Sequence, residues 1–483
     1  MRDNKGVLSN FIWKFAERIS AQLVTLIVSI VLARQLSPSE YGIISIVTIF
    51  ITFANVFISD GLGTALIQKK DADSLDFSSV LFFNVGISVV LYLCLYFSAP
   101  YIAMFYGDGY EILTPVMRVL GVKLIIAAIS SIQQAYVSRE MIFHKFFVST
   151  LVGTIFSGFV GIYLAYNGYG VWALVAQYLS NSLIGTFCLS VSLRWIPKIQ
   201  FSFERIRKNA KFGLNILSAK LIVVGFEEIR ALLIGKFYSS QDLAYYDKGK
   251  QFPNLVVANV DASLSAVLLP KMSRQQDDLN AVRATMRSSI RLGSFVMFPL
   301  FWGLMAIGDN LIVTLLTEKW LQSVELLRIF CVYYMFNHVH SANLQAIKAI
   351  GKSNIFLKLE YIKKAIEIIV LIVVVRLGVT TIALSMAVLS TMFLLLNTYP
   401  SKRIFNYGFI QQFKDVIPSL FASATMGCFV WLISFLPLGN VVMLFTQVIV
   451  GAVIYIVVAK ILNIPELLYI WTLFKRVLSN KSR

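Results

Sequence analysis

FFVSTLVGTIFSGFVGIYLAYNGYGVWALVAQYLSNSLIGTFCLSVSL, residues 146–193, contains no charged side chain. A helix that crosses a bilayer needs about 20 predominantly apolar residues. This stretch is therefore too long for one span. The sequence NGYG at 167–170 interrupts it near the middle, and such a cluster is a turn signal. We predict a hairpin of two membrane helices here, and this hairpin sets the fold class of the chain.

The whole chain of 483 residues has the composition of a polytopic membrane protein. Hydrophobic residues make up 58% of it and charged residues only 14%. A soluble chain is about 45–50% apolar and about 25% charged. Soluble domains could not bury this much apolar surface, because cores stop growing at about 250–300 residues. The composition excludes a soluble enzyme, a disordered chain and a collagen-like rod.

Reading every apolar run in the same way predicts an all-α fold with about fourteen transmembrane helices. The run 416–459 divides at PLGN, residues 437–440, as the first run does at NGYG. The tail 465–483 is expected to form an amphipathic helix on the membrane surface. No cleavable signal peptide is expected, because the basic start lacks a small-residue cleavage site. The expected spans are 11–33, 41–63, 79–104, 112–137, 146–166, 171–193, 209–235, 250–270, 290–316, 323–347, 356–375, 379–399, 415–436 and 440–460.

The positions of Lys and Arg predict the orientation of these spans. With a cytoplasmic N-terminus, 28 of the 43 Lys and Arg lie in or beside cytoplasmic segments, and six lie in or beside external loops. Cytoplasmic loops of membrane proteins carry such an excess, so we expect both termini in the cytoplasm. The net charge of +18 is then an orientation signal, and no nucleic-acid partner is expected. The four cysteines have no zinc spacing, and neither a metal nor a cofactor is expected.

The two halves of the chain show a weak repeat at an offset of 202 residues. LARQLSPSEYG (32–42) falls over LIGKFYSSQDLAYY (233–246), which places Ser37 on Ser239 and Glu40 on Asp242. Repeats of like orientation are a known transporter plan, with substrate bound near the midplane. The predicted domains are the N-lobe with helices 1–6 (1–200), the C-lobe with helices 7–12 (201–400), helices 13–14 (401–464) and the cytoplasmic tail (465–483).

Charges inside the predicted spans are the most informative residues, because a charge at the bilayer centre costs about 3 kcal/mol. Nine cations and eight acids fall there, on only some of the helices, which are expected to line a wet space. Local pairing or a position at a helix end is the open alternative for each. The candidates for a cationic substrate cavity are Lys14, Arg18, Arg118, Lys123, Lys220 and Arg230. The candidates for coupling to a proton or sodium ion are Glu227, Glu228, Asp60 and Asp261.

LARQLSPSEYGIISI (32–46) and DGLGTALIQKKD (60–71) resemble the first helical hairpin of bacterial oligosaccharide flippases. These are the Wzx-like and teichuronic-acid-exporter-like polysaccharide transporters of the MOP superfamily. The motif positions carried by this chain are Arg34, Pro38, Tyr41, Gly42, Gly61 and Gly63. Pro38 and Gly42 are expected to form the turn between the helices, and Arg34 to bind substrate or to anchor the helix end among lipid headgroups.

The resemblance implies a V-shaped pair of six-helix lobes with helices 13 and 14 appended. It implies that an undecaprenyl-diphosphate-linked oligosaccharide is moved from the cytoplasmic to the outer leaflet by alternating access. The product would serve surface polysaccharide export, as O-antigen, capsule, exopolysaccharide or teichuronic-type polymer. The implied location is the bacterial cytoplasmic (inner) membrane, with membrane lipids, a polysaccharide polymerase and export machinery as partners. A wet, cationic cavity would replace the hydration of sugar and diphosphate.

Two other functions remain open at this point. A cation-coupled multidrug exporter of the same superfamily would favour an acidic or aromatic pocket for organic cations. A peptidoglycan lipid-precursor flippase differs little in sequence pattern from an oligosaccharide flippase. A membrane glycosyltransferase or polymerase should carry a large external loop or an acidic catalytic motif, and the sequence shows neither, so no enzymatic activity is expected.

Overall fold

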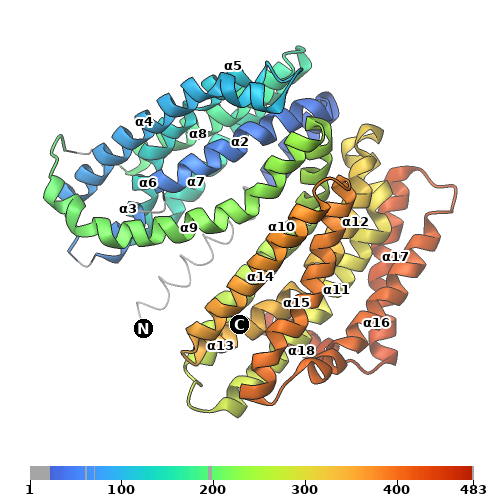
Figure 1. The fold of residues 1–483 in the computed structure, drawn as a ribbon. Helices are drawn as coiled ribbons and strands as arrows, with labels where there is room; N and C mark the ends of the chain where they lie inside the picture. The colour runs from blue at the N-terminus through green and yellow to red at the C-terminus, as the bar shows by residue number, and fades with distance from the viewer. Residues whose placement is uncertain (1–21, 60–61, 70, 194–197, 481–483) are drawn as a thin grey trace. The chain divides into compact units, whose positions relative to one another are not determined.

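The structure is a computed structural model that describes residues 22–59, 62–69, 71–193 and 198–480. Within these ranges 88% of the residues are helical and no strand occurs. Nine of the described helices are long and apolar enough to cross a membrane. The predicted all-α membrane fold is therefore confirmed, and the protein is a multi-pass membrane protein. Three further long helices, labelled in Figure 1, are α9 (Phe203–Phe237), α10 (Ser240–Ser273) and α14 (Ser353–Val374). Each of them contains several charged residues.

The first of two compact units comprises residues 1–244. A short apolar helix, Gln22–Gln35, precedes the labelled helices. Within this unit α9 packs along α2, α3 and α4, and α6 contacts α2, α4 and α8. The labelled helices are α2 (Pro38–Ser59), α3 (Leu62–Gln68), α4 (Ser74–Tyr106), α5 (Leu113–Leu120), α6 (Lys123–Glu140), α7 (Phe143–Tyr166), α8 (Val171–Leu193) and α9 (Phe203–Phe237).

The predicted hairpin at 146–193 is confirmed as the pair α7 and α8, which pack against each other extensively. Small residues bring the two backbones together, since a Cβ on Gly153 would lie 3.0 Å from the backbone nitrogen of Gly185. Small residues are the usual means of close helix approach in membranes. Gly168 and Gly170 adopt positive φ values of 76° and 56° in the connecting turn, a conformation that favours glycine.

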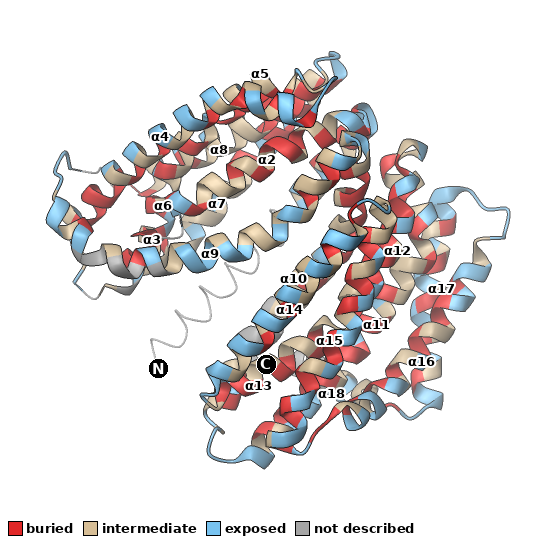
Figure 2. Cartoon of the chain, in the orientation of Figure 1, coloured by how far each residue is buried: buried red, intermediate tan, exposed pale blue. Residues whose placement is uncertain are grey.

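The second unit comprises residues 245–483. Its centre is α11, which packs against α12, α13, α16 and α17 and is buried along much of its length (Figure 2). The elements are α10 (Ser240–Ser273, beginning in unit 1), α11 (Leu279–Leu316), η1 (Glu318–Trp320), α12 (Gln322–Met335), α13 (Asn337–Ala349), α14 (Ser353–Val374), α15 (Val379–Phe405), α16 (Phe409–Ile433), α17 (Asn440–Ile461) and α18 (Pro465–Asn480).

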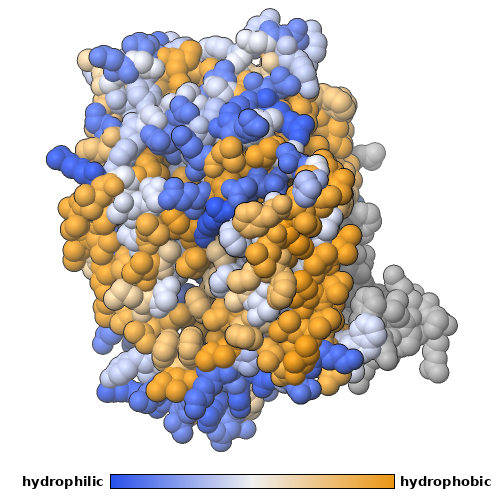
Figure 3. Space-filling model, turned by 90° about the vertical axis from the view of Figure 1, so that its right-hand side faces the viewer, coloured by the Kyte–Doolittle hydropathy of each residue, from blue (hydrophilic) through white to orange (hydrophobic). Residues whose placement is uncertain are grey.

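The helices expected as 13 and 14 are α16 and α17, and they pack on α11 inside unit 2. An ion pair joins Arg287 of α11 to Asp415 of α16 through two contacts of 2.7 Å. Arg291 of α11 pairs with Glu466 of α18 at 2.7 Å. Figure 3 views the side of the molecule that carries α16 and α17, where apolar residues cover much of the middle and hydrophilic residues gather toward both ends. This distribution is that of a surface exposed to a bilayer.

Two of the expected spans each consist of two helices. The span expected at 112–137 is Leu113–Glu140, which remains one candidate membrane span although a turn at Gly121 and Val122 separates α5 from α6. The span expected at 323–347 is divided into α12 and α13 at Phe336. Discontinuous membrane helices leave backbone groups without intrahelical partners, and transporters use them to build binding sites. Lys123 and Asn337 are the first residues after the two breaks.

Candidate functional site

The 32–46 motif forms a tight corner between the helix Gln22–Gln35 and α2. The Glu40 carboxylate accepts hydrogen bonds from the backbone nitrogen (2.6 Å) and the hydroxyl (2.9 Å) of Ser37. The Ser37 hydroxyl in turn accepts a bond from the Glu40 backbone nitrogen at 3.4 Å. This reciprocal arrangement is a capping box, which satisfies donors at a helix start. Pro38 occupies the first helical position, where its missing N–H costs nothing.

A second corner with the same bonds begins α10. The Asp242 carboxylate accepts from the backbone nitrogen (3.1 Å) and the hydroxyl (2.6 Å) of Ser239, and the Asp242 nitrogen donates to that hydroxyl at 3.0 Å. These are the two residues that the 202-residue offset places over Ser37 and Glu40. The sequence correspondence is therefore matched by local structure at this corner.

Gly42 has a packing role, because it lies inside α2 and not in the turn. A Cβ on Gly42 would lie 1.7 Å from the carbonyl oxygen of Ser240, and both residues belong to unit 1. The start of α10 thus rests directly on the backbone of α2. Tyr41, beside Gly42, donates its hydroxyl to the Ser29 carbonyl at 3.3 Å, which ties the two arms of the corner together. Arg34 is exposed.

Two predicted cavity cations lie against aromatic rings in unit 1. The Arg118 guanidinium lies 4.3 Å from the ring centroid of Tyr96 and donates to the Tyr96 carbonyl oxygen at 3.2 Å. The Lys123 ammonium lies 5.3 Å from the ring centroid of Tyr178 in α8. Cation–π contacts stabilise a positive charge without neutralising it. Sequence reasoning missed Tyr178, because this uncharged residue lies in a charge-free run.

The four predicted charges of α9 lie on one long helix of unit 1. Lys220 and Glu227 are exposed, and Glu228 and Arg230 are half-buried. Arg230 donates to the Phe226 carbonyl oxygen one turn earlier, at 3.5 Å. Of the remaining predictions, Gly63 lies in α3, where an added Cβ would meet no atom within 4 Å. Lys14, Arg18, Asp60 and Gly61 lie outside the described residues.

An ionic cluster, which the sequence reasoning did not single out, joins α3, α4 and α9. The fully buried Asp76 carboxylate contacts the Lys69 ammonium at 2.7 Å and an Arg205 guanidinium nitrogen at 3.5 Å. Asp73 caps α4 by accepting from the Asp76 backbone nitrogen at 2.9 Å, and Arg205 also contacts Asp73 at 3.3 Å. The start of α9 is thereby fixed to the junction between α3 and α4.

The Asp73 carboxyl should contribute a pH-dependent part of the stability. The bond from the Asp76 backbone nitrogen, aided by the charges of Arg205 and Lys69, holds the pKa of Asp73 below its usual 3.8. A carboxyl group whose pKa is lower in the folded state stabilises the folded protein at pH values above its unfolded-state pKa. This stabilisation is lost as the pH falls through the folded-state pKa. Below about pH 4 the melting temperature should therefore fall less steeply with decreasing pH for Asp73→Asn than for the natural protein. The reason is that asparagine can cap the helix but does not titrate. Equal slopes for both proteins would contradict this prediction.

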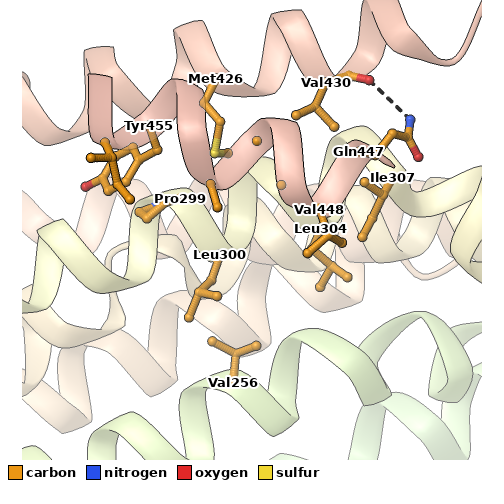
Figure 4. A pocket seen from close by; sticks show the side chains of 14 residues that line it. Val256, Pro299, Leu300, Leu304, Ile307, Met426, Val430, Gln447, Val448 and Tyr455 are labelled. Atoms are coloured by element: carbon orange, nitrogen blue, oxygen red, sulfur yellow. Dashed lines mark hydrogen bonds between the residues drawn. The ribbon is translucent and has the colours of Figure 1, made fainter. Parts of the chain in front are cut away.

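An apolar pocket of about 460 Å³ lies in unit 2 between α10, α11, α16 and α17 (Figure 4). Gln447 is its polar edge, and its side-chain nitrogen donates to the Val430 carbonyl oxygen at 3.1 Å. This lining suits hydrocarbon and offers almost nothing to a sugar. The lining residues are Val256, Pro299, Leu300, Gly303, Leu304, Ile307, Met426, Val430, Gln447, Val448, Gly451, Ala452, Tyr455 and Ile456.

The two histidines of α13 form hydrogen bonds with polar groups of α11 and α15. His338 Nε2 lies 2.7 Å from the Ser294 hydroxyl. His340 binds the Ser390 carbonyl oxygen through Nε2 (3.1 Å) and Asn397 through Nδ1 (2.8 Å). The rings therefore point to different neighbours, as their i,i+2 spacing predicts. Both have structural hydrogen-bond partners within unit 2.

Comparison with known proteins decides the family. Residues 31–325, more than half of the chain, match the family described as Polysaccharide biosynthesis protein. The chain belongs to this family. Among its relatives is the teichuronic acid biosynthesis protein TuaB of Bacillus subtilis (strain 168), 23% identical over 73% of each chain. The succinoglycan biosynthesis transport protein ExoT of Rhizobium meliloti (strain 1021) is 20% identical over 65% of this chain and 64% of its own.

Solved structures confirm the fold of this family member. The lipid II flippase MurJ, in an inward closed conformation, matches with a TM-score of 0.76 at 17% identity over 93% of this chain and 98% of its own. A multidrug resistance MATE family transporter of the MOP superfamily matches with a TM-score of 0.57 at 14% identity, over 80% and 96% of the two chains. The resemblance first seen in 32–46 and 60–71, to polysaccharide transporters with a MOP-type fold, is confirmed.

Proposed function

We propose that this protein is a flippase for an undecaprenyl-diphosphate-linked oligosaccharide in surface polysaccharide export. The family match carries the proposal, because the relatives named above act in polysaccharide biosynthesis and one is named as a transport protein. The charges of α9 support it. If this long helix lies within the membrane, Lys220 and Arg230 need water or polar partners, because a charge facing lipid is costly. The expected movement is from the cytoplasmic to the outer leaflet by alternating access, without covalent chemistry.

The chemistry of the substrate fits the residue types available. A diphosphate and sugar hydroxyls cannot enter hydrocarbon without replacement hydrogen bonds. Lysine and arginine supply them, arginine through bidentate contacts to phosphate. Lys123 and Arg118 are two such cations, and each lies against an aromatic ring. The lipid part of the substrate needs only apolar surroundings.

The placement in the cell is part of the same proposal. The distribution of Lys and Arg supports a bacterial cytoplasmic membrane location with both termini inside. We propose that the functional lobes follow the sequence repeat, residues 1–200 and 201–400, with 401–464 as an added pair. A polysaccharide polymerase acting on the delivered oligosaccharide is the partner class that the proposed function requires.

Lys220→Ala should lower export at least about tenfold, because a hydrogen bond to a charged group contributes about 1.5–3 kcal/mol. The measurement is the leaflet distribution of lipid-linked glycans in the native host, beside the deletion strain. Lys198→Ala, on an exposed loop, is the matched control. Arg18→Ala should behave like Lys220→Ala.

Normal glycan export in the deletion strain, with lost drug efflux or lost lipid-precursor transport, would replace the proposal by one of its two rivals. Loss of folded protein in Lys220→Ala would make that residue structural.

A further inference from the structure

Asp261 of α10 meets the break between α12 and α13. The Asn337 side-chain nitrogen donates to Asp261 Oδ2, and Asn337 is the first residue of α13. Asp261 Oδ1 is buried and has no hydrogen-bond partner among the described residues. The carboxyl group therefore has one oxygen held and one oxygen open. The sequence reasoning named Asp261 but missed Asn337, an uncharged residue.

Asp261 forms no ion pair among the described residues. The two histidines of α13, His338 and His340, follow Asn337 in sequence and bond to Ser294 and to Ser390 and Asn397. Ten further charges on the helices of unit 2 form five ion pairs with one another. These pairs are Arg287–Asp415, Arg291–Glu466, Arg328–Asp309, Lys363–Glu360 and Lys364–Glu367. A buried carboxylate without a cation is costly to keep ionised.

The break itself supplies further polar groups. The carbonyl oxygen of Tyr333 in the last turn of α12 accepts a hydrogen bond from the Ser390 hydroxyl of α15 at 2.9 Å. Asp261 contacts the first residue of α13, and interrupted helices in transporters line the sites of substrates and coupling ions. An ionisable group at such a place inside a membrane is a functional candidate.

We propose that Asp261 is the proton-binding group that couples transport to the proton gradient, and that Asn337 positions it. A proton taken from water forms an O–H bond at Oδ1, and this bond breaks when the proton returns to water on the other side. The Asn337 amide donates to Oδ2 in both states. A proton needs only the open Oδ1, whereas a metal cation needs several oxygen ligands. No group of three or more His, Cys, Asp or Glu side chains that could hold a metal ion occurs among the described residues. The use of this proton in transport rests on the proposed function, whereas its binding does not.

Infrared difference spectra of the full-length protein in lipid vesicles, between acidic and alkaline pH, test the proposal. The protein has 25 acidic side chains, so the band to follow is one component of the carboxylic C=O absorption. This component should be present in the natural protein and in Asp277→Asn, an exposed loop control, and be lost in Asp261→Asn. Asn337→Ala should keep the band at a shifted frequency, which tests the positioning role of Asn337. This variant also replaces Asp261→Asn in the test if Asp261→Asn does not fold. An unchanged band in Asp261→Asn, or no shift in Asn337→Ala, would overturn the respective assignment.

Two further outcomes separate this inference from the proposed function. Removal of the band by sodium at constant acidic pH would overturn proton specificity in favour of a cation site. A band that depends on Asp261, in a protein whose deletion leaves lipid-linked glycans unaffected, would support the proton site and reject the flippase proposal. Loss of gradient dependence of glycan export in Asp261→Asn, with unchanged export in Asp277→Asn, would support both.

Discussion

Gly42→Ala is expected to destabilise the folded protein by about 1–3 kcal/mol or more, the range for inserting a methyl group where no space exists. The added Cβ would lie 1.7 Å from the Ser240 carbonyl oxygen, and 2.8 Å from the Ser240 Cα. Both are backbone atoms at the capped start of α10, so no side-chain rotation relieves the clash. The two helices must separate for the methyl group to fit.

The sign of this effect is what makes it informative. Glycine inside a helix is normally less stable than alanine by about 0.5–1 kcal/mol, so a Gly→Ala change in α2 should stabilise if packing were absent. Gly63→Ala in α3 is the matched control, because its Cβ would meet no atom within 4 Å. We expect the melting temperature of the purified protein to fall for Gly42→Ala and to stay or rise for Gly63→Ala. Equal effects of the two changes would mean that α10 does not rest on α2.

The sequence predicted the parts of the fold that hydropathy and turn residues determine. The hairpin α7–α8 follows from an absence of charge and from glycines that the turn requires. The turn at Gly121 and Val122 within one span, and the break at Phe336, escaped prediction, because an interruption of one or two residues leaves the average hydropathy unchanged. Gly42 was read as a turn former, because sequence shows a glycine but not the backbone that approaches it.

The sequence singled out the charged candidates but not the neutral residues that contact them, and the role of these charges in a cavity stays a prediction. Arg118, Lys123 and Asp261 stand out in a sequence because each charge is improbable in a span. Tyr96, Tyr178 and Asn337 do not, since aromatic and amide residues are common in membrane helices. Which neutral residue meets which charge depends on helix packing across long sequence separations. Only the 202-residue repeat offered such information, and it proved useful at the corners of Ser37 and Ser239.

Asp76→Ala is expected to have the second large effect, a loss of about 3–5 kcal/mol of stability. The Asp76 side chain is fully buried, and its loss leaves Lys69 without its 2.7 Å partner. It also removes the carboxylate that accepts from the Asp73 backbone nitrogen at 3.1 Å. Asp71→Ala, at an exposed position two residues before the cap, should change stability by no more than about 0.5 kcal/mol. Chemical denaturation of the purified proteins measures both.

The contribution of α9 to this cluster can be separated by adding Arg205→Ala. Arg205 contacts Asp76 at 3.5 Å and Asp73 at 3.3 Å, yet its side chain is 35% exposed, so solvent screens the interaction. The double mutant Asp76→Ala/Arg205→Ala should be less destabilised than the sum of the single mutants, with a coupling of about 0.5–3 kcal/mol. Strict additivity would mean that Arg205 does not fix α9 to α4. A coupling that disappears at high salt would show instead that the attachment is electrostatic and exposed to solvent.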